Sequence, residues 1–211
     1  VCKKWNHVSF ISPAYTSKMD LTPYAYKMIR GIDLYNCVLE KAAQKTNISF
    51  CTERVLSVQS TQDSARVELE NQTLTATKVF NSILFEPANV LAHKASDYFL
   101  WQHFKGFEIK TEAPVFNDAV ATLMDFTVDQ SSGTTFMYVM PTSTTTALVE
   151  YTLFTENLLA DKAYTEAITA YIQKTYGHIQ YTITHQEFGQ IPMTNFSFSG
   201  LTKLVVALDQ V

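Results

Sequence analysis

The sequence predicts an α+β fold in which a long antiparallel sheet follows residue 97. Two observations support this prediction: only two segments have helical periodicity, and most other segments are rich in β-branched and aromatic residues. The composition agrees with a folded protein, because 46% of the 211 residues are hydrophobic and 17% are charged. This length suits one large domain or two small ones.

The two predicted helices cover residues 32–45 and 161–176. In the first, apolar side chains recur at a spacing of three to four residues, at Leu34, Cys37, Val38 and Ala42. In the second, the same spacing is found at Ala163, Tyr164, Ala167, Ile168, Tyr171 and Ile172. Asp161 is suited to cap the start of this helix and Gly177 its end.

The predicted strands form a short set and a long set. The short strands cover residues 47–51, 55–60, 65–69 and 73–83, and the longer ones residues 98–109, 122–128, 134–140, 147–154 and 180–188. Polar segments at 129–133 and 142–146 are typical of hairpin connections. Residues 86–95, which include Pro87 and Asn89, are the best candidate for a domain boundary.

Charge and motif content exclude several classes of function. The net charge of −4 gives no basic field for nucleic acid. Three cysteines at irregular spacing, Cys2, Cys37 and Cys51, favour a reducing compartment such as the cytoplasm over a disulfide framework. The five histidines lack metal-ligand spacing, so no metal site is expected. No Gly-x-Gly-x-x-Gly, P-loop or Gly-x-Ser-x-Gly motif occurs, and no apolar run is long enough to span a bilayer.

Glu150 is the most informative single residue. It shares one face of the strand 147–154 with Leu148, Thr152 and Phe154, and the opposite face is also apolar, so we expect both faces to be covered. Burial would raise the pKa of this carboxyl group and make it a usable acid near neutral pH. The alternative is a glutamate at a sheet edge or in an ion pair with Lys or Arg. Asp125, between Met124 and Phe126, has the same two interpretations.

Aromatic side chains are concentrated in the long-strand region. They are Tyr98, Phe99, Trp101, Phe104, Phe107, Phe126, Phe136, Tyr138, Tyr151 and Phe154. Their faces can line a cavity for a long apolar ligand and can stabilise a carbocation. An ordinary aromatic-rich core is the alternative.

Seven blocks in the same order resemble the flavin-dependent lycopene cyclases, most closely the lycopene beta-cyclases of the Bacteroidetes type. The blocks are residues 26–33, 79–85, 102–106, 122–126, 133–141, 147–155 and 187–196. The likeness runs almost continuously from Trp5 to Phe198.

The resemblance implies a two-domain flavoprotein. Residues 1–86 would form part of a FAD/NAD(P)-binding α/β domain, residues 97–196 an antiparallel substrate-domain sheet with one helix, and residues 197–211 a partial return to the flavin domain. The implied activity is the cyclisation of the linear ends of lycopene to β-ionone rings, an isomerisation that depends on reduced FAD and NAD(P)H. The implied partners are a carotenoid substrate and a membrane surface, contacted peripherally from the cytoplasm.

The resemblance also implies roles for individual residues. The acidic motif of the family, Phe-Leu-Glu-Glu-Thr in plant members, places its first Glu on Glu150, the expected catalytic acid, and its second position on Tyr151. Asp125 is the second catalytic candidate, expected to orient Glu150 or the flavin edge. Phe126, Phe136, Tyr138 and Tyr151 are expected to bind substrate.

Two family features are absent from the sequence: the N-terminal Gly-x-Gly-x-x-Gly turn that holds the FAD pyrophosphate and the C-terminal glycine-rich segment. We therefore expect a central fragment that by itself neither retains FAD nor cyclises lycopene. Two other functions remain open, a related FAD-dependent monooxygenase and a non-catalytic domain that binds apolar ligands. The sequence does not distinguish cyclisation of one end of lycopene from cyclisation of both.

Overall fold

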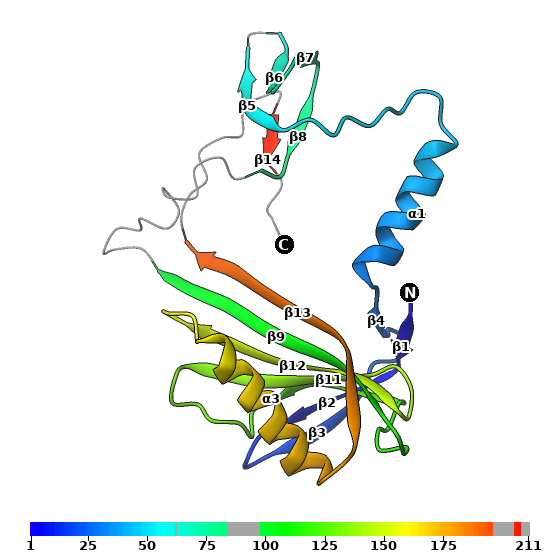
Figure 1. Cartoon of the computed structure of the whole chain (residues 1–211), viewed down its shortest axis with the longest axis vertical. Helices are drawn as coiled ribbons and strands as arrows, with labels where there is room; N and C mark the ends of the chain where they lie inside the picture. Colours follow the sequence, from blue (N-terminus) through cyan, green and yellow to red (C-terminus); the bar gives the residue numbers. More distant parts are fainter. Residues whose placement is uncertain (62, 84–97, 196–204, 208–211) are drawn as a thin grey trace. The chain divides into compact units, whose positions relative to one another are not determined.

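A computed structural model describes residues 1–61, 63–83, 98–195 and 205–207 of the chain (Figure 1). The chain forms two compact units. The first comprises Val1–Lys41 and Leu100–Met193, and the second comprises Ala42–Phe99 and Thr194–Val211.

The first unit is built on a seven-stranded sheet in the order β13-β9-β12-β11-β10-β2-β3 (Figure 1). Its strands are β2 His7–Ile11, β3 Thr16–Asp20, β9 Phe99–Thr111, β10 Val120–Asp125, β11 Thr134–Pro141, β12 Thr146–Thr155 and β13 Tyr181–Thr194. The pairs β9–β12, β12–β11 and β11–β10 are antiparallel, which confirms the predicted antiparallel sheet and its two hairpin connections. The pair β10–β2 is parallel, so the sheet as a whole is mixed.

One face of this sheet is covered by helix α3, Asp161–Tyr176 (Figure 1). The helix buries Tyr164, Ile168, Tyr171 and Ile172 in one core cluster with Val149, Tyr151 and Leu153 of β12. Its predicted bounds are confirmed, but the predicted cap is wrong: Ala160 is at the N-cap without a side-chain hydrogen bond, and Asp161 is the first helical residue. Gly177 ends the helix at a positive φ of 76°, and its N–H donates to the carbonyl of Gln173. An L side chain rarely adopts this backbone conformation, which explains glycine at this position.

A short ribbon and all but the last two residues of a helix complete the first unit. The ribbon pairs β1, Lys3–Trp5, with β4, Tyr26–Met28. Trp5 is buried with Val8 and Ala121, and partly buried residues including Met140 pack against them. Helix α1, Gly31–Ala43, confirms the helix predicted over residues 32–45, although it ends two residues earlier.

The second unit contains two small sheets. One is antiparallel and joins β5 Val55–Ser60, β6 Ala65–Leu69 and β7 Thr73–Ala76; the other pairs β8 Val79–Asn81 in parallel with β14 Val205–Ala207. Two strand predictions were wrong here. Residues 47–51 form no strand and are all exposed, because no described strand pairs with them, and the strand predicted over residues 73–83 is interrupted after Ala76.

The division into units differs from the predicted boundary at residue 86. Residues 1–41 belong to the first unit because β2 pairs with β10 through five residue pairs. The predicted boundary at 86–95 lies outside the described residues. The end of the chain does return to the short-strand region, since β14 pairs with β8. The assignment of that region to a flavin domain stays a prediction.

Candidate active site

Glu150 lies on β12, an inner strand of the seven-stranded sheet. Its cross-strand neighbours are Tyr138 on β11 and Gly106 on β9. Side chains alternate along a strand, so Glu150 points away from the face that packs against α3. We call the opposite face, which carries Phe136, Tyr138, Glu150 and Thr152, the acid face. Among the described residues Glu150 forms no ion pair, so neither the sheet-edge nor the ion-pair interpretation applies.

Burial raises the pKa of Glu150 from its ordinary value to about 7. The hydroxyl of Thr152 opposes this rise, because its Oγ1 donates to Glu150 Oε1 at 2.8 Å and favours the charged form. The negative charge of Glu187 adds to the rise. A large fraction of Glu150 is therefore protonated near neutral pH, which is the state that a general acid requires.

Glu187 reaches the acid face from β13, the strand next to β9. Gly106 on β9 makes room for it: a Cβ atom built on Gly106 would lie 2.9 Å from Glu187 Oε1 and 3.0 Å from its Cγ. The Glu187 carboxyl group thus lies over the glycine that is paired with Glu150. Sequence reasoning missed this residue. Its only signal was the position of Glu187 at the start of one of the blocks that resemble the family.

The charge of Glu150 affects the pKa values of two nearby tyrosines. Burial, and to a lesser extent the Glu150 carboxylate, raises the pKa of Tyr26 on β4. Burial also raises the pKa of Tyr138, with smaller contributions from Tyr26 and Glu150. Both phenols are therefore neutral near neutral pH and add no charge beside Glu150.

Aromatic rings continue the acid face beside Glu150. Phe136 packs edge-to-face against Phe126 and Tyr138, with ring centroids 5.5 and 5.1 Å apart, and at 6.3 Å against Phe154. Three of the four predicted substrate-binding residues, Phe126, Phe136 and Tyr138, are thus brought together with Glu150. Their contact with substrate stays a prediction.

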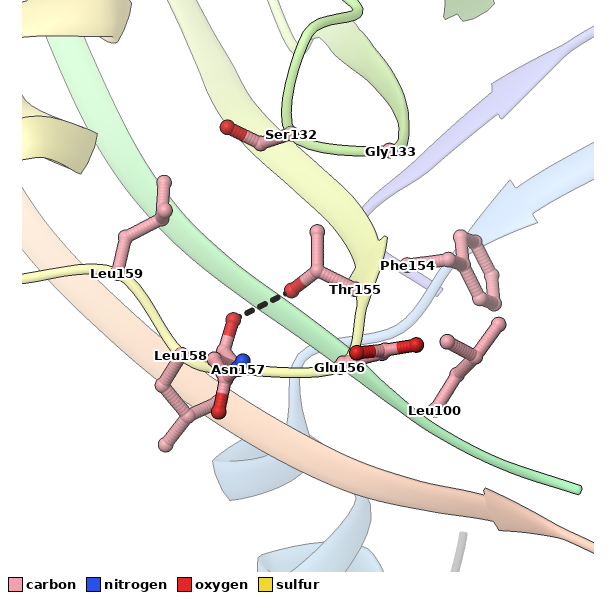
Figure 2. A pocket seen from close by; sticks show the side chains of 9 residues that line it. All are labelled: Leu100, Ser132, Gly133, Phe154, Thr155, Glu156, Asn157, Leu158 and Leu159. Carbon is pink, nitrogen blue, oxygen red and sulfur yellow. Dashed lines mark hydrogen bonds between the residues drawn. The ribbon is translucent and has the colours of Figure 1, made fainter.

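A pocket of about 500 Å³ lies beyond the end of β12 (Figure 2). Its apolar lining comes from Leu100, Phe154, Leu158 and Leu159, and its polar lining from residues that include Ser132 and Glu156. The loop after β12 is fixed by Thr155, whose hydroxyl donates to the carbonyl of Asn157 at 2.5 Å. Because Phe154 also packs against Phe136, this pocket adjoins the aromatic rings of the acid face.

Asp125 and Tyr151 lie on the other face of the sheet, toward α3. Asp125 is buried and accepts hydrogen bonds from the Tyr171 hydroxyl at 2.8 Å and the Thr127 N–H at 2.9 Å. Tyr151 is a core residue whose ring meets that of Tyr164 at 6.4 Å. The structure does not bring either residue to Glu150, so orientation of Glu150 by Asp125 does not fit this placement. Whether Asp125 acts in catalysis by another route stays a prediction.

Comparison with known proteins identifies the family. The sequence model of the lycopene cyclase protein family matches residues 1–207. The chain belongs to the lycopene cyclase family. This membership confirms the family resemblance of the sequence blocks and supports an enzyme. No curated protein matches the sequence.

Solved structures similar to this lycopene cyclase family member are flavoproteins and related enzymes. A flavoprotein/dehydrogenase from Cytophaga hutchinsonii has a TM-score of 0.59 at 10% identity, with 97% of this chain and 54% of that chain covered. A geranylgeranyl bacteriochlorophyll reductase-like protein from Thermoplasma acidophilum has a TM-score of 0.60 at 13% identity, with 90% and 50% covered. A p-nitrophenol 4-monooxygenase from Pseudomonas putida has a TM-score of 0.64 at 10% identity, with 97% and 55% covered. The fold is therefore that of part of a FAD-binding α/β enzyme, and the chain spans about half the length of these proteins.

Proposed function

We propose that the protein is a lycopene beta-cyclase that converts the linear ends of lycopene into β-ionone rings, with Glu150 as the proton donor. Membership of the lycopene cyclase family supports the reaction class. The observation that carries the assignment of the acid is a carboxyl group with a pKa of about 7 beside aromatic rings on an inner strand.

Glu150 starts the reaction by donating its proton to the terminal alkene of the substrate. The electron pair of the double bond forms the new C–H bond and leaves a tertiary carbocation, which a second double bond attacks to close the ring. Loss of one proton from the ring then leaves the β-ionone double bond. One proton enters and one leaves, so the product is an isomer of the substrate. The faces of Phe136 and Tyr138 stabilise the cation through their π-electrons.

The acid face and its adjoining pocket suit an elongated apolar substrate. Glu150 and Phe154 are four residues apart on β12, a distance of about 13 Å at the rise of a β-strand. With a linear end group of the substrate at Glu150, the polyene that follows would extend past Phe136 and Phe154 toward the pocket beyond β12.

FAD with a nicotinamide donor is the cofactor set that the resemblance implies, and reduced FAD would support the cyclisation without net oxidation. The described residues do not fit the FAD pyrophosphate. Helix α1 begins at a single glycine, Gly31, with the Arg30–Asp33 ion pair in its first turn. Helix α3 begins at Asp161, whose carboxylate repels phosphate. Every step proposed for this chain therefore uses its own side chains.

The substrate suggests where the enzyme works. None of the described helices is long and apolar enough to cross a bilayer. Lycopene is apolar enough to reside among lipid tails. We therefore propose that the protein contacts the cytoplasmic surface of a membrane peripherally to reach it.

The test expresses the complete gene, with and without Glu150→Gln, in bacteria that accumulate lycopene. We expect β-carotene or a singly cyclised carotene from the wild type, and lycopene with at least a 100-fold loss of cyclised product from the variant. Glu108→Gln is the matched control, because Glu108 is on the neighbouring strand and bonds to Thr184 instead of Glu150.

Three other outcomes have separate meanings. Cyclised product from Glu150→Gln at the wild-type rate would rule out Glu150 as the acid. Oxygen-dependent hydroxylation of the substrate would favour the monooxygenase alternative. Tight carotenoid binding without any cyclised product, equal in both forms, would favour a non-catalytic binding domain.

A further inference from the structure

Two carboxyl groups from separate strands meet on the acid face. Glu150 comes from β12 and Glu187 from β13, with β9 between them. The residue of β9 between them is Gly106, which has no side chain to separate them. Gly106 is the cross-strand partner of Glu150, and the Glu187 carboxyl lies over it. The negative charge of Glu187 raises the pKa of Glu150, so the two carboxyl groups interact beside this glycine.

The two members of the pair have different surroundings. Glu150 is on an inner strand, and Leu148 and Thr152 beside it on the same face are buried. Glu187 is partly buried on β13, the outermost strand of the sheet. Burial and the neighbouring Glu187 charge both raise the pKa of Glu150, so Glu150 is the member of the pair that carries the proton.

The groups that face the pair do not disturb this arrangement. Tyr26 from β4 and Tyr138 from β11 are neutral phenols, and Thr152 from β12 is a hydroxyl donor to Glu150. Within the described ranges, neither Glu150 nor Glu187 forms an ion pair with Lys, Arg or His. The pair therefore has one proton to give and one carboxylate free to accept.

We propose that Glu187 is the second catalytic carboxyl group of the cyclisation site: Glu150 delivers the proton to the alkene, and the Glu187 carboxylate takes up the proton that the ring loses. This inference rests on the proposed cyclase function. The balance closes, because the proton taken up by Glu187 passes on to the neighbouring Glu150 carboxylate and restores the pair. While the carbocation exists, two carboxylates beside it stabilise its positive charge.

Glu187→Gln in the enzyme expressed from its complete gene tests the proposal. We expect kcat to fall about 100-fold, with KM little changed, because the acceptor of the ring proton is lost. We also expect the loss of activity at high pH to begin roughly one pH unit lower, because the charge that helps to keep Glu150 protonated is gone.

Gly106→Ala is the second variant and keeps both carboxyl groups. The new methyl group would meet Glu187 Oε1 at 2.9 Å and displace that carboxyl from Glu150. We expect a roughly 10-fold fall in kcat and a shift of the pH profile in the same direction. Glu108→Gln on the same face is the control and should leave both the rate and the profile unchanged.

A measurement without substrate separates this inference from the proposed function. In the infrared spectrum, the band of a protonated carboxyl group should vanish in Glu150→Gln and should titrate at lower pH in Glu187→Gln than in the wild type. Wild-type kcat and an unshifted pH profile in Glu187→Gln, in an enzyme that Glu150→Gln inactivates, would overturn the role of Glu187 alone. Absence of cyclisation in the wild type, with the infrared shift present, would overturn the proposed function and leave the carboxyl pair.

Discussion

At Glu150, burial should make the stability of the protein depend on pH. The pKa of this carboxyl rises from an ordinary 4.5 to about 7 in the folded state, so the folded protein holds the proton more tightly than the unfolded chain. Between about pH 4.5 and pH 7 the folded state binds more protons, and the free energy of unfolding therefore falls as pH rises. The full loss, on the order of 3 kcal/mol, is reached above pH 7.

Glu150→Gln isolates this contribution, because glutamine has a similar shape and does not titrate. Urea denaturation of both forms at a series of pH values should show the variant gaining stability relative to the wild type as pH rises through this window. Titratable groups that do not interact with Glu150 cancel in the difference. A difference that stays constant from pH 4.5 to pH 8 would mean that the carboxyl of Glu150 keeps an ordinary pKa.

The sequence predicted Glu150, the proposed acid, but not Glu187, the carboxyl group beside it. Alternation along residues 147–154 is a local pattern, and it placed Glu150 among apolar neighbours without a structure. The same alternation placed Tyr151 on the opposite face of the strand. The family resemblance nevertheless led us to expect Tyr151 among the substrate-binding residues. Glu187 and Gly106 could not be found this way, because their meeting with Glu150 depends on the order β13-β9-β12, which no local pattern specifies.

At the scale of elements, α3 is held to the sheet by polar contacts as well as by its apolar stripe. Tyr171 donates to the buried Asp125, and Lys105 pairs with Asp161 at 2.7 Å. Tyr171→Phe leaves the Asp125 carboxyl with one fewer donor, so we expect the free energy of unfolding to fall by about 1–3 kcal/mol in urea denaturation. Tyr176→Phe, on the same helix with its ring against Phe116, is the control.

The same pair of residues tests whether Asp125 has a catalytic role. If its role is to hold α3, Asp125→Asn should lower stability about as much as Tyr171→Phe, and the double variant should show coupling between the two sites. Turnover per folded molecule would then stay near the wild-type value. A large fall in turnover at unchanged stability would instead support the catalytic role that the family resemblance gives Asp125.

Elements with strong local signals were predicted well, and those that depend on distant partners were not. The helix over residues 161–176 has apolar periodicity and a glycine at its end, and its bounds are confirmed. The strand predicted over residues 47–51 has alternating apolar residues, but it does not form, because none of the strands in the described part of the chain pairs with it. Strand β2, in contrast, forms because it finds a distant partner. It pairs in parallel with β10, more than a hundred residues away along the chain.

Residues that are far apart in the sequence belong to the same unit of this protein, so a residue's position along the chain does not indicate its domain. The first unit takes strands from both ends of its sequence range, because β2 and β3 extend a sheet whose other strands begin near residue 99. The buried clusters around Phe107 and Trp5 both lie in this unit. The acid face therefore belongs to a unit with its own core.

The sequence of the chain predicts whether it holds the cofactor by itself. These 211 residues contain no Gly-x-Gly-x-x-Gly turn, and the described helices begin at Gly31 and Asp161 without a phosphate cradle. We therefore expect the chain, expressed by itself and desalted, to show no flavin absorbance. The carboxyl pair and the aromatic rings of the acid face come from one sheet, so the infrared band of protonated Glu150 should be present in this flavin-free chain. Stoichiometric flavin in the isolated chain would show that its own residues hold the cofactor in a way that neither helix start indicates.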